Sequence, residues 1–354
     1  MEWKSSFFKL YLCCNYCNTS IKIKKFGLSK RFKILINYFL GPLLFIVLSW
    51  SLYKQVINQP DLNNRIDEIK NSWRHQGLWW VIVLMLVNWG IEARKWQLLV
   101  RRVQNLSFIK ALKSVFAGCS VTMLTPNRVG EYGGRILYVA EGNRIKAISL
   151  TIVGSISQLL ITRIVGCLGL LYFKYVHQNN VNILSAIPSL WSNGLIFLSV
   201  GVTALLFMFY LRIGWLVRVM EKVPAFQKVT KHIAVLDEFG DRQLLHILSL
   251  SFLRYMVFVL QYVILLQVMH VDIGGWICFW LMTVFYLVMA IAPTFGFIEL
   301  PVRAKASWEL FKLYTTNELG VGASALGIWL INLVVPAIIG SLLILSIKIV
   351  REND

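Results

Sequence analysis

The stretch that decides the fold is Leu124-Thr125-Pro126-Asn127-Arg128-Val129-Gly130-Glu131-Tyr132-Gly133-Gly134-Arg135, which directly follows an apolar run that starts at Val115. It holds three charged residues, three glycines and a proline. Such a segment is unsuited to a lipid-facing helix, because non-helical backbone at membrane depth must be buried in protein or line a cavity. Charged side chains are costly at that depth, so a functional site is the first interpretation.

A second stretch repeats this order of residues. Ala292-Pro293-Thr294-Phe295-Gly296-Phe297-Ile298-Glu299-Leu300-Pro301-Val302-Arg303 also follows an apolar run, and it too ends in a glutamate with an arginine four residues later. Glu131 and Glu299 are 168 residues apart in a chain of 354. Two interrupted hydrophobic segments at matching places predict an internal repeat of the kind found in transporters.

The composition is that of a membrane protein. Hydrophobic residues make up 57% of the chain, charged residues only 15%, and the mean hydropathy is +0.64. A soluble protein of this size carries more charge, and several runs here approach the roughly 20 apolar residues that cross a bilayer. We predict an all-α polytopic membrane protein with a basic tail, residues 1–34, and one transmembrane domain, residues 35–350.

The net charge of +19 indicates how the chain meets the membrane. Its basic residues are dispersed among loops, which is typical of the positive-inside rule and of contact with anionic headgroups. We therefore predict anionic membrane lipids as partners and no nucleic acid. The basic tail predicts a multi-pass protein of the cell membrane with its N-terminus in the cytoplasm.

About eight hydrophobic segments are present, and loop charges favour six full spans and two re-entrant hairpins. The hairpins would enter from opposite faces, which makes residues 35–176 and 194–350 an inverted repeat and puts 299–320 outside. Eight ordinary spans are the competing count. Residues 94–113 are predicted as an amphipathic helix at the cytoplasmic surface. The predicted spans are 35–53, 78–92, 147–175, 194–211, 248–269 and 321–347, and the hairpins begin with 115–124 and 276–292.

The first motif has the residues of an anion site. If residues 128–138 are helical, Arg128, Glu131 and Arg135 project from one face, with the carboxylate between two guanidiniums. Arginine is suited to bidentate phosphate binding. Pro126 suits the start of a helix, and a helix N-terminus attracts anions. The glycines that allow close backbone approach are Gly130, Gly133 and Gly134.

The second motif carries a similar pair. Glu299 and Arg303 are spaced for contact on a helix, and Gly296 allows a turn after Pro293. The span after the first motif adds three polar residues that either line the same cavity or form a stripe between packed helices: Gln158, Thr162 and Arg163.

Three roles remain open for the two motifs. The Glu–Arg pairs are structural ion pairs, a binding site for a headgroup phosphate, or a site with a catalytic glutamate. The five histidines form no ligand spacing, and the CxxC pair Cys14 and Cys17 has no second pair near it. We predict no metal, no cofactor and no enzymatic activity.

Residues 125–135 resemble the "PGRxGE" segment of the lysylphosphatidylglycerol synthase transmembrane-region family, also called flippase-like domain proteins. Residues 293–303 resemble that family's second motif, and residues 88–96 its second-span ending. Two departures stand out. Asn127 replaces the usual glycine, and residues 294–296 read Thr-Phe-Gly where many members have Pro-Gly-Gly.

The resemblance implies that the chain binds or translocates a lipid. Two-domain members carry an aminoacyl transferase after the membrane part, and a chain ending at Asp354 leaves no room for one, so we expect no lipid aminoacylation by this chain alone.

Our first hypothesis is a flippase-like protein for an anionic or phosphate-linked lipid. Arg128 and Arg135 would hold the phosphate, Glu131 would orient them, and Glu299 with Arg303 would form the opposite gate. The alternatives are a membrane enzyme that uses Glu131 or Glu299 as base on a lipid phosphate, and an accessory subunit of an envelope lipid or glycan synthesis system.

Overall fold

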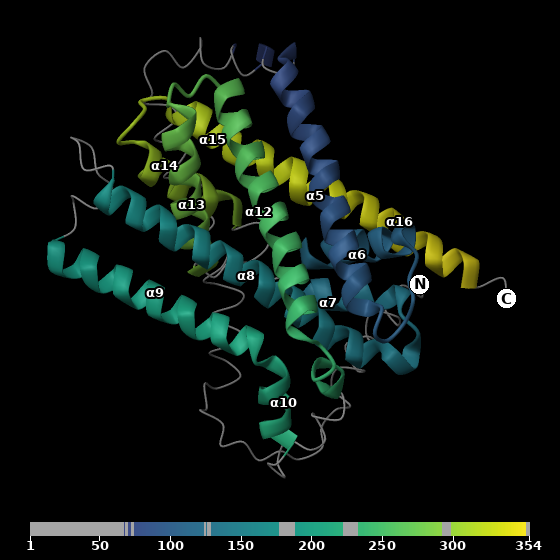
Figure 1. Ribbon diagram of the computed structural model, residues 1–354. Helices are drawn as coiled ribbons and strands as arrows, with labels where there is room; N and C mark the ends of the chain where they lie inside the picture. The colour runs from purple at the N-terminus through teal and green to yellow at the C-terminus, as the bar shows by residue number, and fades with distance from the viewer. Residues whose placement is uncertain are drawn as a thin grey trace, which may run out of the picture. The chain divides into compact units, whose positions relative to one another are not determined.

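The described part of the chain is entirely helical (Figure 1). The computed structural model describes residues 67, 70–71, 74–123, 125, 129–176, 188–221, 233–291 and 299–351, all within one compact unit, residues 44–354. The helices are α5 (Gln76–Val100), α6 (Phe108–Met123), α7 (Gly130–Arg135), α8 (Arg144–Tyr175), α9 (Ser189–Leu211), α10 (Ile213–Glu221), α12 (Asp241–Val268), α13 (Gly275–Ile291), α14 (Glu299–Phe311), α15 (Glu318–Trp329) and α16 (Val335–Arg351).

Shorter helical turns connect these elements. A π-helical turn, η8 (Leu330–Val334), joins α15 and α16 into one continuous stretch. The remaining short turns are the 3-10 helices η3 (Ile136–Tyr138), η4 (Glu141–Asn143) and η6 (Ala234–Leu236).

Five helical stretches are long and apolar enough to cross a membrane: α5, α8 with the turn before it, α9, α12, and α15 continued into α16. They coincide with five of the six predicted spans. The sixth, residues 35–53, lies outside the described residues. The prediction of an all-helical polytopic membrane protein is therefore confirmed. The two segments predicted to begin hairpins form α6 and α13, whose 16 and 17 residues fall short of a full span.

One boundary is wrong in the sequence-based prediction. The second span was expected to end at Glu92 and an amphipathic helix to cover 94–113. Instead α5 continues to Val100, and the chain leaves helical structure before α6 begins. The physical reason is an ion pair. The Glu92 carboxylate lies 2.8 Å from the Lys95 ammonium and neutralises it, so the helix continues past Lys95. Trp96 is then completely buried rather than interfacial.

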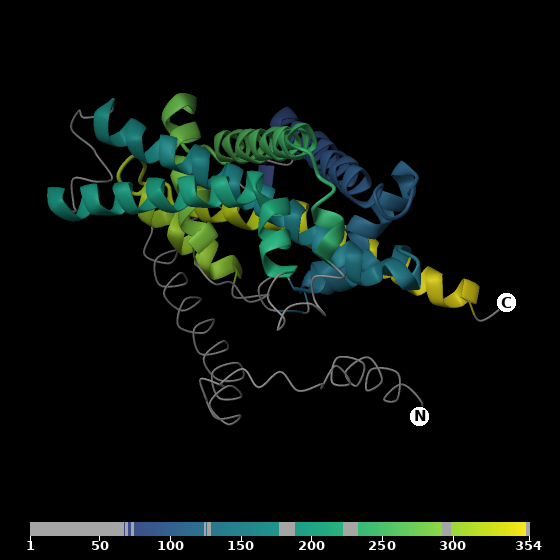
Figure 2. The ribbon, with the colours of Figure 1, turned by 60° about the horizontal axis from the view of Figure 1, so that its bottom comes forward.

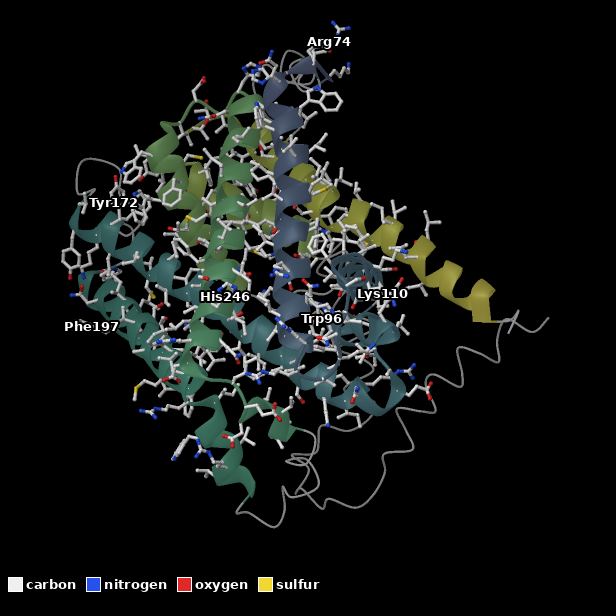
Figure 3. The ribbon with its side chains drawn as sticks, turned by 45° about the vertical axis from the view of Figure 1, so that its right-hand side comes forward. Arg74, Trp96, Lys110, Tyr172, Phe197 and His246 are labelled. Atoms are coloured by element: carbon white, nitrogen blue, oxygen red, sulfur yellow. The ribbon has the colours of Figure 1, made fainter. Side chains whose placement is uncertain are left out.

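α5 and α12 pack against each other as an antiparallel pair along one face of the helical bundle, and both ribbon views show the two helices side by side (Figures 1 and 2). Side-chain bonds tie them along their length. Gln261 donates to the Val81 carbonyl at 2.8 Å, and Arg254 Nε donates to Asn88 at 2.9 Å. Arg74 and Trp96 mark the two ends of α5 in Figure 3.

The first motif folds back tightly on the helix before it. A Cβ at Gly134 would overlap the Ala117 carbonyl on α6, and one at Gly130 would overlap the Val121 carbonyl. The chain turns between the helices at Thr125, whose hydroxyl accepts from the Gly130 N–H at 2.7 Å. The helices α6 and α7 therefore form a compact hairpin.

Other close contacts place the second motif and the outer helices. α13 packs on α8, where a Cβ at Gly166 would meet Leu287. α14 is fixed to α12 by the bond between Tyr262 and Ser307, 3.1 Å long. α9 runs beside α8 and leaves large apolar side chains exposed, such as Phe197 (Figure 3). That exposure fits a helix that faces lipid.

Candidate functional site

A cluster of buried charges lies between α5, α7 and α12. Glu92 is its centre. Its Oε2 lies 2.8 Å from Lys95 Nζ and 3.0 Å from Arg254 Nη1, and its Oε1 lies 2.6 Å from Arg135 Nη2. The side chains of Glu92, Lys95 and Arg135 are at most 4% exposed. One carboxylate thus holds three cations away from water.

A second carboxylate completes this cluster. Glu131, on α7, is the other partner of Arg135, and it is the member with the most exposed side chain, at 26%. We call Glu92, Lys95, Glu131, Arg135 and Arg254 the buried charge cluster. Its three cations and two carboxylates leave one net positive charge. That excess favours an anion at this depth, where unpaired charge is costly.

Aromatic rings fix the two arginines. The guanidinium of Arg135 lies 5.3 Å from the ring centre of Trp96. The guanidinium of Arg254 lies 5.4 Å from Trp89 and 5.3 Å from Phe258. Such cation–π contacts stabilise a charge that has lost part of its water, so the rings help to hold both side chains in place.

A chain of amides continues from the cluster across the fold. Arg254 bonds Asn88, whose amide donates to Asn332 at 3.3 Å, and Asn332 donates to Gln261 at 3.0 Å. Asn332 belongs to the π-helical turn η8. Such turns widen a helix locally and are frequent at functional sites. The network therefore connects α5, α12 and the last span.

A cavity of about 180 Å³ opens beside this cluster and collects residues from both sequence motifs. Glu131 reaches it from α7, whereas Glu299 and Arg303 reach it from α14. Arg254 of the buried charge cluster also lines it. We call it the central cavity; its other lining residues are Trp89, Cys119, Thr122, Gln158, Thr162, Tyr255, Phe258, Tyr286, Ile328, Trp329, Asn332 and Leu333.

The second motif forms a tight ion pair at the cavity wall. Both Nε and Nη2 of Arg303 contact the same oxygen of Glu299, at 2.8 and 2.5 Å. Their side chains are 15% and 8% exposed. An arginine has five N–H donors, so this pair leaves Arg303 donors for a further acceptor.

Several buried polar atoms of cavity-lining residues hydrogen-bond no other residue in the described part of the chain. These are the indole N–H groups of Trp89 and Trp329, the hydroxyl of Tyr255 and the side-chain oxygen of Gln158. Buried polar groups are nearly always bonded. Three of the four are hydrogen-bond donors, so water or a ligand with acceptor oxygens would satisfy them.

The structure brings together five of the residues predicted from the sequence. Glu131, Glu299 and Arg303 line the central cavity, as do Gln158 and Thr162. The remaining predicted residues that the structure describes are not among the lining residues of this cavity.

Arg135 is buried behind Glu131 in the charge cluster, and Arg163 is partly buried on α8 and is not among the cavity-lining residues described. Gly130 and Gly134 pack against α6, whereas Gly133 has no neighbour within 4 Å of a Cβ. Four predicted residues lie outside the described residues: Arg128, Pro126, Pro293 and Gly296.

Three residues of the cluster have no role in the sequence-based prediction. Glu92 and Lys95 lie in residues 88–96, which resemble the end of a span, and Arg254 lies within the predicted span 248–269. Their signal is in the sequence nonetheless, because each is a charge inside an apolar run, and intramembrane charges pair with one another. No group of three or more His, Cys, Asp or Glu in the described residues is placed to hold a metal ion.

Comparison with known proteins agrees with this architecture. The profile of the family described as "Lysylphosphatidylglycerol synthase TM region" matches residues 38–298, well over half of the chain. A search of curated proteins found no match. The matched region includes α5, the α6–α7 hairpin, α12 and α13, and it ends one residue before Glu299. The resemblance seen in the sequence is confirmed: the chain belongs to the lysylphosphatidylglycerol synthase transmembrane-region family.

Proposed function

We propose that this protein binds the phosphate of an anionic lipid headgroup in the central cavity and moves the lipid between leaflets. The observation that carries the proposal is the meeting of the two motifs. Glu131 and the Glu299–Arg303 pair come from distant parts of the chain, yet they line one cavity together with Arg254.

The chemistry of the cavity supports a phosphate ligand. Arg254 and Arg303 supply guanidinium donors, which match phosphate oxygens in pairs. Trp89, Trp329 and Tyr255 add neutral donors that bond no other described residue. The buried charge cluster adds one net positive charge beside them. Together these groups favour an anion with several acceptor oxygens.

The size of the cavity supports a headgroup rather than a whole lipid. Its volume of about 180 Å³ corresponds to roughly six water molecules at about 30 Å³ each. Acyl chains would stay in the surrounding bilayer while the headgroup passes the cavity. The polar groups would replace the water that the headgroup loses, which is the main cost of crossing.

The order of elements supports an inverted repeat. A long, a short, a short and a long helical stretch follow one another as α5, α6, α7 and α8, and again as α12, α13, α14 and α15 continued into α16. We propose that the two hairpins enter the membrane from opposite faces and meet at the cavity. We also propose that the protein lies in the cell membrane with its N-terminus in the cytoplasm. Pseudo-symmetric halves of this kind can expose one site to each side in turn.

The roles of the arginines follow from their burial. We propose that Arg254 and Arg303 contact the headgroup, while Arg135 orients Glu131 and Glu92 from behind. Arg128, which lies outside the described residues, stays a predicted ligand of the phosphate at the start of α7.

A translocation assay tests the proposal. The purified chain is reconstituted into vesicles with fluorescent phosphatidylglycerol, and loss of signal to an added quencher reports movement to the outer leaflet. We expect Arg303→Gln to slow movement roughly tenfold to hundredfold, the value of one or two charged hydrogen bonds. Arg218→Gln is the matched control, because Arg218 is exposed and pairs with Asp237 away from the cavity.

Equal rates in Arg303→Gln and wild type would contradict the proposal. The same vesicles separate transport from catalysis, because we propose no covalent step. Mass spectrometry of the recovered lipid should show it unchanged. A modified lipid that disappears in Glu131→Gln, with movement intact, would instead identify an enzyme. Movement by the purified chain alone would also exclude a purely accessory role in a synthesis system.

A further inference from the structure

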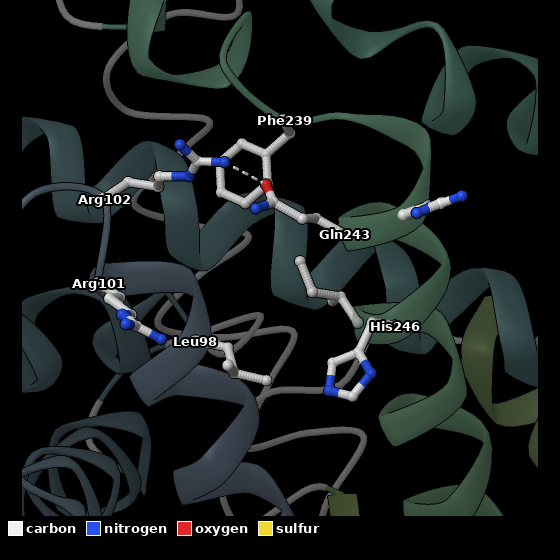
Figure 4. A pocket seen from close by; sticks show the side chains of 8 residues that line it. Leu98, Arg101, Arg102, Phe239, Gln243 and His246 are labelled. Atoms are coloured by element: carbon white, nitrogen blue, oxygen red, sulfur yellow. Dashed lines mark hydrogen bonds between the residues drawn. The ribbon is translucent and has the colours of Figure 1, made fainter.

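A second pocket lies where the end of α5 meets the start of α12 (Figure 4). Its volume is about 470 Å³. It shares no lining residue with the central cavity. We call it the arginine pocket; it is lined by Leu98, Arg101, Arg102, Phe239, Arg242, Gln243, His246 and Ile247.

The charged side chains described in the lining of the arginine pocket are all positive. Arg101 and Arg102 reach it from the turn that directly follows α5, and Arg242 from α12, and the lining residues that the structure describes include no carboxylate. Glu238 and Asp241 are neighbours of lining residues in the chain but are not among the lining residues described, and Asp237 pairs with Arg218 at 3.0 Å. Three arginines around one pocket give it an excess of positive charge, which a bound anion would offset.

One of these arginines is already held in position. Arg102 Nη2 donates to Gln243 Oε1 at 2.5 Å, and its guanidinium lies 5.8 Å from the ring centre of Phe239. Figure 4 shows Arg101 and Arg102 facing Gln243 and His246 across the pocket. Because the guanidinium of Arg102 is already held in place, less conformational entropy is lost when an anion binds.

The depth of the pocket matches that of lipid headgroups. α5 and α12 are both long enough to cross the membrane, and the pocket lies at their shared end. α5 has 25 residues, about 37 Å at 1.5 Å per residue, which is longer than the roughly 30 Å hydrocarbon core. Arg101 and Arg102 directly follow its last residue, so the arginine pocket belongs to the headgroup region.

We propose that the arginine pocket binds a phosphate-bearing anion at the membrane surface, as a second site separate from the central cavity. Basic pockets between spanning helices are suited to anionic lipid headgroups, and free phosphate has the same chemistry. Occupation would link the ends of α5 and α12, the helices that also carry the buried charge cluster. The proposal does not depend on the translocation function.

Binding measurements on the full chain in detergent test this site. The probes are a fluorescent short-chain phosphatidylglycerol, its phosphatidylcholine counterpart, and inorganic phosphate as competitor. The test variant is Arg101→Gln with Arg242→Gln. The matched control is Arg94→Gln with Arg74→Gln, which removes the same charge from exposed positions outside the pocket. Arg303→Gln serves as the background variant, so that binding in the central cavity does not hide the result.

We expect the test variant to weaken phosphatidylglycerol binding at least about tenfold in the Arg303→Gln background, with the control within about twofold. If inorganic phosphate displaces the lipid at equal affinity, the ligand is a free phosphate; if it does not, the ligand is a lipid headgroup. Equal binding by test variant and control, or equal affinity for phosphatidylcholine, would overturn the proposal. If the double variant fails to fold, Arg242→Gln alone is measured in its place and should also weaken phosphatidylglycerol binding.

Discussion

At the residue scale, Glu92 determines how charge is kept inside this protein. It contacts three cations while its side chain is 4% exposed. Removing one partner of a buried ion pair leaves a charge without compensation, which costs more than the intact pair contributes. Glu92 is therefore first a structural residue, and through Arg254 it also supports the wall of the central cavity.

The first prediction concerns this carboxylate. Glu92→Gln should lower the free energy of unfolding by about 3–5 kcal/mol, because Lys95, Arg135 and Arg254 would lose their shared counter-charge. The effect is measured by heating the protein in detergent and recording the fraction that stays monodisperse at each temperature. Glu238→Gln is the exposed control and should leave stability within about 0.5 kcal/mol of wild type. A variant as stable as this control would refute the role of Glu92.

The sequence predicts the motif residues better than their partners. Glu131, Glu299 and Arg303 stand out because each lies in a broken apolar segment. The pairing of Glu92 with Arg135 and Arg254 joins residues 43 and 162 positions apart, and no local pattern encodes such a contact. Only the cost of an isolated charge in lipid indicates that partners must exist.

At the element scale, the α6–α7 hairpin depends on two glycines that face α6. Gly134 and Gly130 lie against backbone carbonyls of α6, where no Cβ fits. Gly133, on the same short helix, has open space around it. Gly134 and Gly133 are therefore a matched test position and control position for the close packing of α7 on α6.

The second prediction uses this pair. Gly134→Ala should destabilise the protein by about 1–3 kcal/mol, because the new methyl group overlaps the Ala117 carbonyl and must push the helices apart. Gly133→Ala should be neutral or slightly stabilising, since alanine is the better helix former. Melting temperatures in one detergent compare the two. A similar loss in both variants would show that close packing on α6 is not the cause.

The boundary of α5 shows what hydropathy cannot determine at this scale. Apolar composition places the span at residues 78–92, and the charges of Arg94 and Lys95 predict its end there. The helix continues because Lys95 points into the protein and meets Glu92 at 2.8 Å. Hydropathy counts a charge in the same way whether it faces water or a buried partner.

At the scale of the whole molecule, hydropathy and loop charge predict the class and most of the spans. Five predicted spans coincide with long helices, and the segments predicted to begin the hairpins form the shorter helices α6 and α13. The orientation of the two halves depends on the charges of the loops between the spans.

The third prediction addresses that orientation. Thr315→Cys, placed in the turn after α14, should react with an impermeant thiol reagent added outside intact cells, because the repeat puts residues 299–320 outside. Cys119, Cys167 and Cys278 are buried, and Cys13, Cys14 and Cys17, which lie outside the described residues, are replaced by serine in the background of this test. Labelling only after the cytoplasmic face is exposed would contradict the inverted hairpins.

The central claim is that both motifs act on one headgroup, and a double-mutant cycle on translocation tests it most directly. Rates for fluorescent phosphatidylglycerol are measured in Glu131→Gln, Arg303→Gln and the double variant. Residues that share one site are energetically coupled, so the double variant should be no more than about threefold slower than Arg303→Gln alone. Independent effects that multiply in the double variant, or wild-type rates in all three, would contradict a shared site.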